Sequence, residues 1–270
     1  MQATFDFSGR QVFVFGGTSG INLGIAQCFA NAGADVAVAS RSQDKVDAAV
    51  AQLGEAGGNA RGYALDVRDL AAVKEALQQH ADEAGELDVL VSGAAGNFPA
   101  FANDMSANGF KSVVDIDLLG SFHVLQSAFP FLKKPGASVV NISAPQAFLA
   151  MPMQSHVCAA KAGVDMLTRT LALEWGAAGI RINSIAPGPI EDTEGMRRLA
   201  PTPEIAEQVK RSVPLGRYGA ASEIGHAAMF LSSDAGAYIS GVVLPVDGGW
   251  SVGGASAAAF MMGQQLAQRG

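Results

Sequence analysis

The sequence predicts an α/β fold in which helices cover both faces of one doubly wound parallel sheet. Short apolar runs rich in β-branched residues alternate along the chain with longer segments of helical period, the rhythm of parallel strands joined by crossover helices. The 270 residues are 49% hydrophobic and only 16% charged, with 32 glycines, and such a chain can bury a substantial core. Because no linker or internal repeat interrupts the rhythm, we expect a single domain over residues 1–270.

The expected strands are short, and the segments between them are long enough for helices. Residues 106–133 predict one or two helices, and residues 153–178 contain a long one. Pro187-Gly188-Pro189 ends the sixth strand, and the stretch after it is richer in charge and proline, which predicts a substrate lid over about 189–214. In chain order, the expected strands are 12–15, 35–39, 62–65, 89–91, 139–142, 180–185 and 242–246.

Charge and hydropathy argue against several kinds of partner. The net charge of −7 argues against nucleic acid as the main partner. No apolar stretch approaches the roughly 20 residues that cross a bilayer, and the first residues lack a basic segment followed by an apolar one. We therefore expect a cytoplasmic protein without membrane association. Cys28 and Cys158 lack metal-ligand spacing and the histidines are scattered, so no metal site is expected.

A glycine-rich turn follows the first strand and opens a helix. Residues 15–21 read F-G-G-T-S-G-I. The backbone N–H groups of such a turn, together with a helix N-terminus, form a site for a pyrophosphate, and glycine permits close approach. A tight structural turn would use the same residue types, so the turn alone is a weak signal. The residues expected to hold a dinucleotide here are Gly16, Thr18, Ser19, Gly20 and Ile21.

The end of the second strand favours a phosphorylated cofactor. Ser40-Arg41-Ser42 offers no carboxylate to accept hydrogen bonds from an unphosphorylated ribose. Arg41, with Ser42 beside it, can instead pair with a 2′-phosphate, because a guanidinium forms charge-assisted hydrogen bonds with phosphate. The pattern favours NADPH over NADH; the alternative for Arg41 is an ordinary surface arginine at a strand end.

From about Phe7 to Trp250, the chain resembles the short-chain dehydrogenase/reductase family. Its turn is similar to the family's Thr-Gly-x-x-x-Gly-x-Gly pattern, with Phe15 in place of the threonine and Asn22 in place of the last glycine. The resemblance implies a Rossmann-like fold and a nicotinamide cofactor. It also implies that Asp66 hydrogen-bonds the adenine amino group; the alternative is that Asp66 caps the following helix. The remaining implied cofactor contacts are Val67, Lys161, Pro187, Gly188, Ile190 and Thr193.

The family's catalytic tyrosine is missing from this chain. Its Tyr-x-x-x-Lys motif corresponds to Val157 to Lys161, and Ala144 stands where the family usually has a catalytic serine. Valine and alanine have no proton to give, so proton delivery to a carbonyl oxygen is not supported. Reduction of a conjugated carbon–carbon double bond differs, because the hydride adds to the far end of the conjugated system and the enolate is protonated on carbon. The role implied for Lys161, a hydrogen bond to the nicotinamide ribose, survives the loss of the tyrosine.

Further motifs resemble the 2,4-dienoyl-CoA reductases, the peroxisomal type in particular. They include A-A-G-N-F at 94–98 and T-E-G-M-R-R-L at 193–199, and the peroxisomal enzymes also lack the tyrosine and serine. The resemblance implies that NADPH reduces a 2,4-dienoyl-CoA to a 3-enoyl-CoA. By analogy, Asp117 and Lys161 relay a proton through water to the α-carbon, and Asn97 donates to the thioester oxygen. A structural ion pair for Asp117 and a loop-capping role for Asn97 are the alternatives.

The resemblance also implies contacts for the acyl-CoA substrate and an assembly. Residues 253–270 lie beyond it and fit a cover for a subunit edge or an acyl pocket. A homotetramer is expected, as is usual in the family, and the last residues are not a Ser-Lys-Leu peroxisomal address. The implied substrate contacts are Arg68, Phe98, Ser106 to Asn108, Arg198 and, as a second candidate for the thioester oxygen, Gln146. Core packing for Phe98 and a contact with loop backbone for Gln146 are the alternatives.

Two other functions remain open from the sequence. An NADPH-linked reductase or dehydrogenase of another acyl thioester or carbonyl would use the same cofactor site. A non-catalytic nucleotide-binding protein would explain Val157 and Ala144, but it would not require Lys161 or the motifs on the substrate side.

Overall fold

A computed structural model describes residues 4–253 of the chain. Within them lie β1 (Gln11–Phe15), β2 (Asp35–Ser40), β3 (Ala60–Ala64), β4 (Val89–Ser92), β5 (Ser138–Ile142), β6 (Arg181–Pro187) and β7 (Val243–Val246). They form one seven-stranded parallel sheet in the order β3-β2-β1-β4-β5-β6-β7, the doubly wound arrangement that the sequence predicts. The order reverses between β1 and β4, which is where such sheets open a crevice at the carboxyl ends of their strands.

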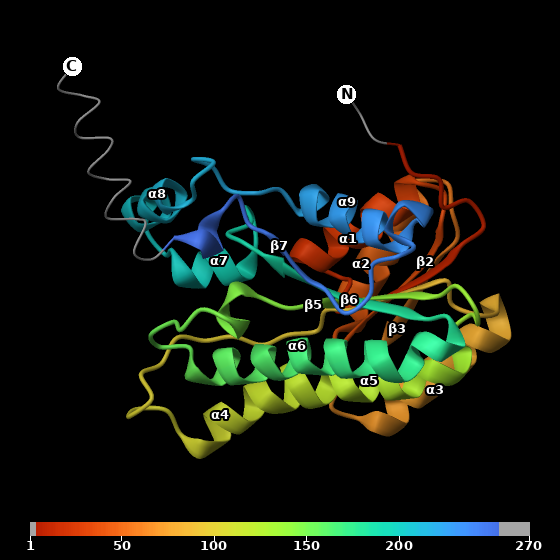
Figure 1. Ribbon diagram of the computed structural model, residues 1–270, viewed down its shortest axis with the longest axis horizontal. Helices are drawn as coiled ribbons and strands as arrows, with labels where there is room; N and C mark the ends of the chain where they lie inside the picture. The colour runs from red at the N-terminus through yellow and green to blue at the C-terminus, as the bar shows by residue number, and fades with distance from the viewer. Residues whose placement is uncertain (1–3, 254–270) are drawn as a thin grey trace.

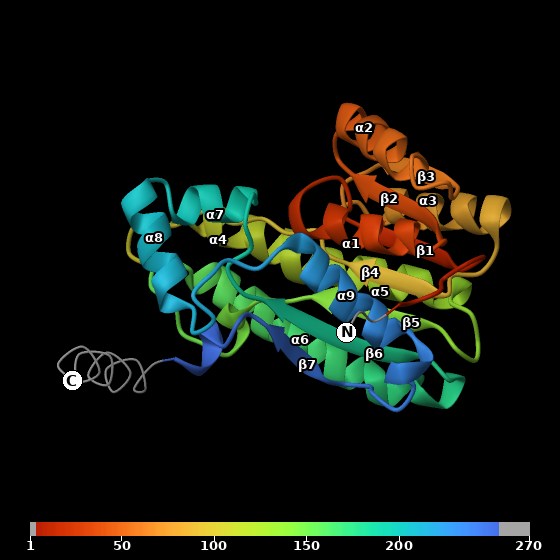
Figure 2. The ribbon, with the colours of Figure 1, turned by 90° about the horizontal axis from the view of Figure 1, so that it is seen from above.

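Helices cover both faces of this sheet (Figure 1). They are α1 (Gly20–Asn31), α2 (Gln43–Gly54), α3 (Leu70–Ala84), α4 (Ala107–Val114), α5 (Gly120–Ala128), α6 (Ser155–Trp175), α7 (Glu194–Leu199), α8 (Pro203–Ser212) and α9 (Ala221–Ser232). On one face α1 packs along α9, with α2 beside it, and on the other α3, α5 and α6 form the second layer. Figure 2 shows α7 and α8 together at one end of the molecule. None of the helices in the described residues is long and apolar enough to cross a membrane.

Two apolar layers hold the helices to the sheet, and β1 contributes to both. Val12 and Val14 point to the α1 side, where Phe29 packs against them, whereas Phe13 and Phe15 point to the α3 and α5 side. Successive side chains of a strand alternate between faces, so burying both faces requires the continuous apolar run seen in the sequence.

A π-helical turn, Asp115–Leu119, joins α4 to α5. The sequence predicts one or two helices over 106–133, and the structure forms α4, this turn, α5 and a 3₁₀ turn at Phe129–Phe131. α4 starts after Ser106, whose hydroxyl caps it by accepting a hydrogen bond from the N–H of Gly109 at 3.0 Å. A π turn adds one residue to a helical turn and often marks a functional site. This one contains Asp117, whose exposed fraction is only 1%.

The observed elements differ from the predicted ones mainly at their ends. β3 begins at Ala60 and ends at Ala64, rather than spanning 62–65, because this edge strand is partly exposed and its apolar pattern is weak. The long helix predicted within 153–178 is α6, followed by a 3₁₀ turn. Segment 189–214 carries α7 and α8, and its action as a lid stays a prediction. Of the tail 253–270, residues 254–270 lie outside the described residues.

Candidate active site

A cleft of about 480 Å³ runs along the carboxyl edge of the sheet. Loops after β1, β2, β4, β5 and β6 form its walls, because the parallel strands all end at this edge. Asn97, Asp117 and Gln146 line it. So do all the predicted cofactor residues, namely Gly16, Thr18, Ser19, Gly20, Ile21, Arg41, Ser42, Asp66, Val67, Lys161, Pro187, Gly188, Ile190 and Thr193.

The glycine turn leaves room for an anion at the start of α1. Gly16 has φ +78°, and a Cβ there would lie 2.9 Å from the backbone nitrogen of Ala94, so the turn requires glycine. Ser19 precedes α1 but its side chain makes no capping hydrogen bond, which leaves the first N–H groups of the helix free for a ligand. Asn22 donates to the carbonyl oxygen of Gly93 at 2.7 Å and so ties the turn to the end of β4. These features fit a dinucleotide pyrophosphate.

Positive charge gathers in the cleft at the end of β2. Arg41 and Lys45 both line the cleft and are exposed, and Ser40 and Ser42, on either side of Arg41 in the sequence, line it too. Lys45, on the first turn of α2, is not among the predicted residues; a second cation four residues after Arg41 is the signal that the sequence offers. This end of the cleft fits a phosphate better than a bare ribose hydroxyl.

Asp66 is paired with Arg68 in this structure. The Arg68 guanidinium donates to both carboxylate oxygens, with a shortest distance of 2.6 Å, and this hydrogen bonding lowers the pKa of Asp66. The alternative role of Asp66 as the cap of the next helix is wrong, because Asp69 caps α3 by accepting from the N–H groups of Ala71 and Ala72. Arg68 therefore stands beside the expected adenine site and outside the cleft lining.

Asp117 and Lys161 form a buried pair at the other end of the cleft. The Lys161 Nζ lies 3.4 Å from Oδ2 of Asp117, and the two residues are 5% and 1% exposed. Lys161 donates its hydrogen bond to the carbonyl oxygen of Ile142 at 2.9 Å, at the end of β5. Oδ1 of Asp117 accepts from the N–H of Gly96 at 2.7 Å, whereas its Oδ2 has no hydrogen-bond partner. The unpartnered oxygen is free to bind a water or a ligand in the cleft.

Burial dominates the electrostatics of this pair. Burial raises the pKa of Asp117, and the opposing effects of Lys161, of the Gly96 N–H and of His156 do not cancel it. His156 is fully buried at the start of α6, packs edge-on against Phe98 with ring centroids 4.6 Å apart, and has no hydrogen-bond partner on either ring nitrogen. The site thus holds a carboxyl group that keeps its proton to a higher pH than an exposed aspartate.

The family positions for tyrosine and serine carry no acid in the folded protein. Val157 and Ala144 both line the cleft. The neighbouring Ser143, which the sequence analysis did not select, also lines it, and its buried hydroxyl has no hydrogen-bond partner. Its place directly after β5 was the signal that pointed to the cleft. The cleft therefore offers a hydroxyl one residue before the expected position, next in the chain to Ile142, whose carbonyl oxygen binds Lys161.

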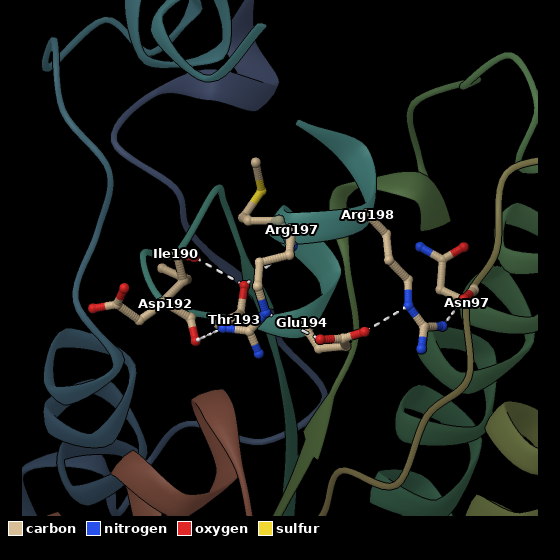
Figure 3. Close-up of polar contacts among 8 residues, drawn as sticks. Asn97, Ile190, Asp192, Thr193, Glu194, Arg197 and Arg198 are labelled. Carbon is tan, nitrogen blue, oxygen red and sulfur yellow. Dashed lines mark hydrogen bonds and ion pairs between the residues drawn. The ribbon is translucent and has the colours of Figure 1, made fainter. Parts of the chain in front are cut away.

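The short helix α7 forms one rim of the cleft (Figure 3). The Thr193 hydroxyl donates to the carbonyl oxygen of Ile190 at 2.9 Å and caps the helix by accepting from the N–H of Met196. Arg198 donates through Nη1 to the carbonyl oxygen of Asn97 at 2.8 Å, across the rim. The Glu194 carboxylate lies between Arg197 and Arg198 and accepts from both.

The predicted substrate residues are more scattered than the cofactor residues. Gln146 donates to Gln154 at 2.9 Å, and both side chains are buried. Ser106 caps α4, and Asn108 is exposed on the same helix. Apart from Gln146, the predicted substrate residues do not line the cleft within the described part of the chain; these are Arg68, Phe98, Ser106, Asn108 and Arg198.

Comparison with known sequences assigns the chain to a family. The family model described as "Enoyl-(Acyl carrier protein) reductase" matches residues 16–251. The chain is 44% identical over 254 residues to a peroxisomal 2,4-dienoyl-CoA reductase of Arabidopsis thaliana, covering 89% of this chain and 84% of the relative. The Rattus norvegicus enzyme of the same name is 42% identical, and the match covers 89% of this chain and 83% of that enzyme. A Bacillus subtilis protein named "Probable 2,4-dienoyl-CoA reductase [(2E)-enoyl-CoA-producing]" is 37% identical, covering 89% and 96%.

Solved structures agree with the sequence relatives. A short chain dehydrogenase from Bacillus anthracis is 37% identical with a TM-score of 0.81, covering 90% of this chain and 96% of that one. The Pseudomonas aeruginosa RhlG/NADP complex is 29% identical with a TM-score of 0.85, covering 93% and 100%. The fold is thus similar to that of a protein whose structure holds NADP. The chain belongs to the short-chain dehydrogenase/reductase family and is an oxidoreductase similar to the peroxisomal 2,4-dienoyl-CoA reductases.

Proposed function

We propose that the protein reduces a 2,4-dienoyl-CoA to a 3-enoyl-CoA with NADPH. The observation that carries this proposal is the buried Asp117–Lys161 pair facing a cleft in which Val157 and Ala144 replace the usual proton donors. A site of this kind can protonate a carbon through water, but it lacks the phenol that a carbonyl reductase uses. Relatives of the same named activity support the substrate class.

The preference for NADPH is supported by Arg41 and Lys45. Both cations line the cleft at the end of β2, and no carboxylate follows Ser40 directly to bind a ribose hydroxyl. The free N–H groups at the start of α1 would hold the pyrophosphate. Lys161 would bind the nicotinamide ribose, and Pro187 would border the ring. When bound, the cofactor supplies a hydride to the far end of the conjugated diene.

The chain's own residues then handle the charge and the proton. Hydride addition places negative charge on the thioester oxygen, where the Asn97 amide would donate a hydrogen bond. Asp117 would deliver a proton to the α-carbon through a water held near its unpartnered Oδ2, which leaves the remaining double bond at the 3-position. Lys161, 3.4 Å away, stabilises the carboxylate that remains and helps to return a proton to it.

The acyl-CoA would enter past α7 and the loop after β4. Phe98 would pack against the acyl chain or pantetheine, and Gln146 would be a second donor near the thioester.

The phosphates of CoA would need positive charge outside the cofactor site. Arg68 offers such a cation, and the polar start of α4 at Ser106 and Asn108 adds hydrogen-bonding groups. Arg198 stands at the same rim, but its side chain is already engaged by Asn97 and Glu194.

Product analysis tests the proposal. The protein is mixed with NADPH and a purified 2,4-dienoyl-CoA, in parallel with a 3-oxoacyl-CoA, and the products are identified by mass and by double-bond position. We expect a 3-enoyl-CoA from the diene and no turnover of the oxo substrate. A 2-enoyl product, as in the name of the Bacillus subtilis relative, would overturn delivery of the proton to the α-carbon. Turnover of the oxo substrate alone would favour the alternative, a reductase of another acyl thioester or carbonyl.

Assembly and location are part of the proposal. Leu119, Phe122, Met166 and Leu173 are large apolar side chains exposed on the segment from the π turn to α6, which supports an interface between copies and hence the expected homotetramer. Light scattering of the full-length protein measures the subunit count. The cytoplasm stays the expected location, and microscopy of the tagged full-length protein tests it against the peroxisomal location in the relatives' names.

A further inference from the structure

α7 connects the two sides of the cleft. Its capping residue, Thr193, lines the cleft beside Gly188 and Ile190, on the cofactor side. Its last turn carries Arg198, whose Nη1 donates to the carbonyl oxygen of Asn97, a residue 101 positions earlier in the chain. Glu194, Met196 and Leu199 of the same helix also line the cleft. The helix therefore lies over the rim and is fixed at both of its ends.

The loop that Arg198 holds also contacts the catalytic carboxyl group. Gly96 donates its N–H to Oδ1 of Asp117 at 2.7 Å, and the next residue, Asn97, accepts the hydrogen bond from Arg198. These two hydrogen bonds involve adjacent residues of the loop: Gly96 bonds to Asp117 in the interior, and Asn97 bonds to Arg198 at the rim. Any movement of α7 away from the loop therefore changes how the loop presents both the Asn97 amide and the Gly96 N–H.

Two neighbouring arginines differ in only one respect that matters here (Figure 3). Arg197 and Arg198 each donate to Glu194 through Nε, at 3.1 and 2.9 Å. Each also donates through Nη1 to a backbone carbonyl oxygen. For Arg197 that oxygen belongs to Asp192, on the same segment, whereas for Arg198 it belongs to Asn97 on the opposite wall. Arg197→Ala is thus a matched control: like Arg198→Ala it removes one positive charge and one hydrogen bond to Glu194, but it leaves the bond from Arg198 to Asn97 in place.

We propose that Arg198 is a positioning residue that closes α7 over the cleft and fixes the Gly96–Asn97 loop for the reaction. Glu194 holds the guanidinium in the orientation that reaches Asn97. This role differs from binding of a CoA phosphate, because Nε and Nη1 of Arg198 donate to a carboxylate and to a carbonyl oxygen of this chain. The effect on turnover rests on the proposed function, whereas the bridge between α7 and the loop does not.

Hydrogen exchange tests the bridge without substrate. Amide exchange is followed by mass spectrometry on peptides that cover residues 93–100, in the unaltered protein and in the variants Arg198→Ala, Arg198→Lys and Arg197→Ala. Loss of a tether lets the loop open more often, so we expect exchange about tenfold faster in Arg198→Ala. Arg198→Lys should recover part of the protection, since an ammonium can still donate to Asn97. Arg197→Ala should match the unaltered protein.

Two substrates separate positioning from phosphate binding. Steady-state rates are measured with a dienoyl-CoA and with the same dienoyl group on pantetheine, which lacks the nucleotide and its phosphates. A misplaced loop lowers kcat, so we expect Arg198→Ala to reduce kcat about tenfold on both thioesters, with a smaller change in KM. Arg197→Ala should stay within about twofold on both.

Defined outcomes overturn the proposal. An increase in KM for the CoA thioester alone would make Arg198 a phosphate-binding residue. Equal behaviour of the two alanine variants, or unchanged exchange over residues 93–100, would show that the bridge holds nothing in place. If the unaltered protein reduces neither thioester, the proposed function fails, and the exchange experiment still decides whether Arg198 fixes the loop.

Discussion

The two ends of the cleft use charge in opposite ways. At the cofactor end, Arg41 and Lys45 are exposed, and the glycine turn contributes backbone N–H groups. At the end proposed to be catalytic, Asp117 and Lys161 are 1% and 5% exposed. Exposed charges are screened by water and salt, whereas a buried charge acts in a medium of low dielectric constant. Substitutions at the exposed end should therefore change affinity modestly, and those at the buried end should change the rate strongly.

The largest effect is expected at the buried end, from Asp117→Asn. Asparagine keeps an oxygen for the Gly96 N–H but cannot supply the proton, so we expect kcat for the dienoyl-CoA to fall by about 10² to 10³-fold. NADPH affinity should stay nearly unchanged. Single-turnover kinetics and cofactor titration measure the two quantities. Unchanged turnover would remove Asp117 from the mechanism and leave it the structural ion pair.

A pH profile and a second carboxyl group sharpen this result. Burial raises the pKa of Asp117, and the protonated form is the acid, so the rate should fall as pH rises through that pKa. The fall should be absent from the residual activity of Asp117→Asn. Asp165 is a matched control, because burial also raises its pKa and it lies on α6 but does not line the cleft. Asp165→Asn should leave the pH profile in place.

His80 tests whether a buried polar group without a hydrogen-bond partner is necessarily catalytic. Like His156, it is buried with no partner on either ring nitrogen, but it packs against Phe13 and Tyr63 in the core between the sheet and α3. Burial, with a smaller contribution from Arg61 that Glu83 opposes, lowers the pKa of His80 from 6.5 to about 4. The unfolded chain therefore binds the proton first as pH falls.

Protonation of His80 is expected to affect the stability of the fold and not catalysis. His80 should lower the free energy of unfolding progressively as pH falls from about 6.5 toward 4, by at most about 3 kcal/mol. His80→Leu should remove this part of the pH dependence while keeping turnover at pH 7. Urea unfolding of both proteins across this range measures it. Equal slopes for both proteins would show that His80 is not the group responsible.

The smallest effect is expected at the exposed end, from Arg41→Ala. Loss of one exposed arginine that pairs with a phosphate should weaken NADPH binding by about tenfold and leave NADH binding unchanged. Fluorescence titration with both cofactors measures the difference, and Arg169→Ala, an exposed arginine on α6 outside the cleft, is the control. Equal weakening of both cofactors would overturn the assignment of Arg41 to the 2′-phosphate.

The structure brings all the residues predicted to bind the cofactor into one cleft, whereas most of those predicted to bind the substrate lie outside its lining. The glycine turn, Arg41 and the loop after Pro187 are short contiguous segments directly after strands, so their place at the carboxyl edge follows from the parallel sheet. Phe98, Arg68 and Arg198 were selected by resemblance, and the structure gives each a partner within the chain. Contacts of this kind join residues from different segments, and no local pattern specifies them.

The sequence by itself determined the strand order along the chain, the glycine-rich turn after the first strand, and the absence of a phenol at Val157. These follow from local chemistry, namely apolar period, backbone freedom and the groups that a side chain carries. Only the tertiary structure decided that Asp117 is buried beside Lys161 and that Arg198 bridges to Asn97. Burial and long-range hydrogen bonds depend on which segments the fold brings together. Burial in turn decides whether water screens a charge or the charge interacts more strongly in a medium of lower dielectric constant.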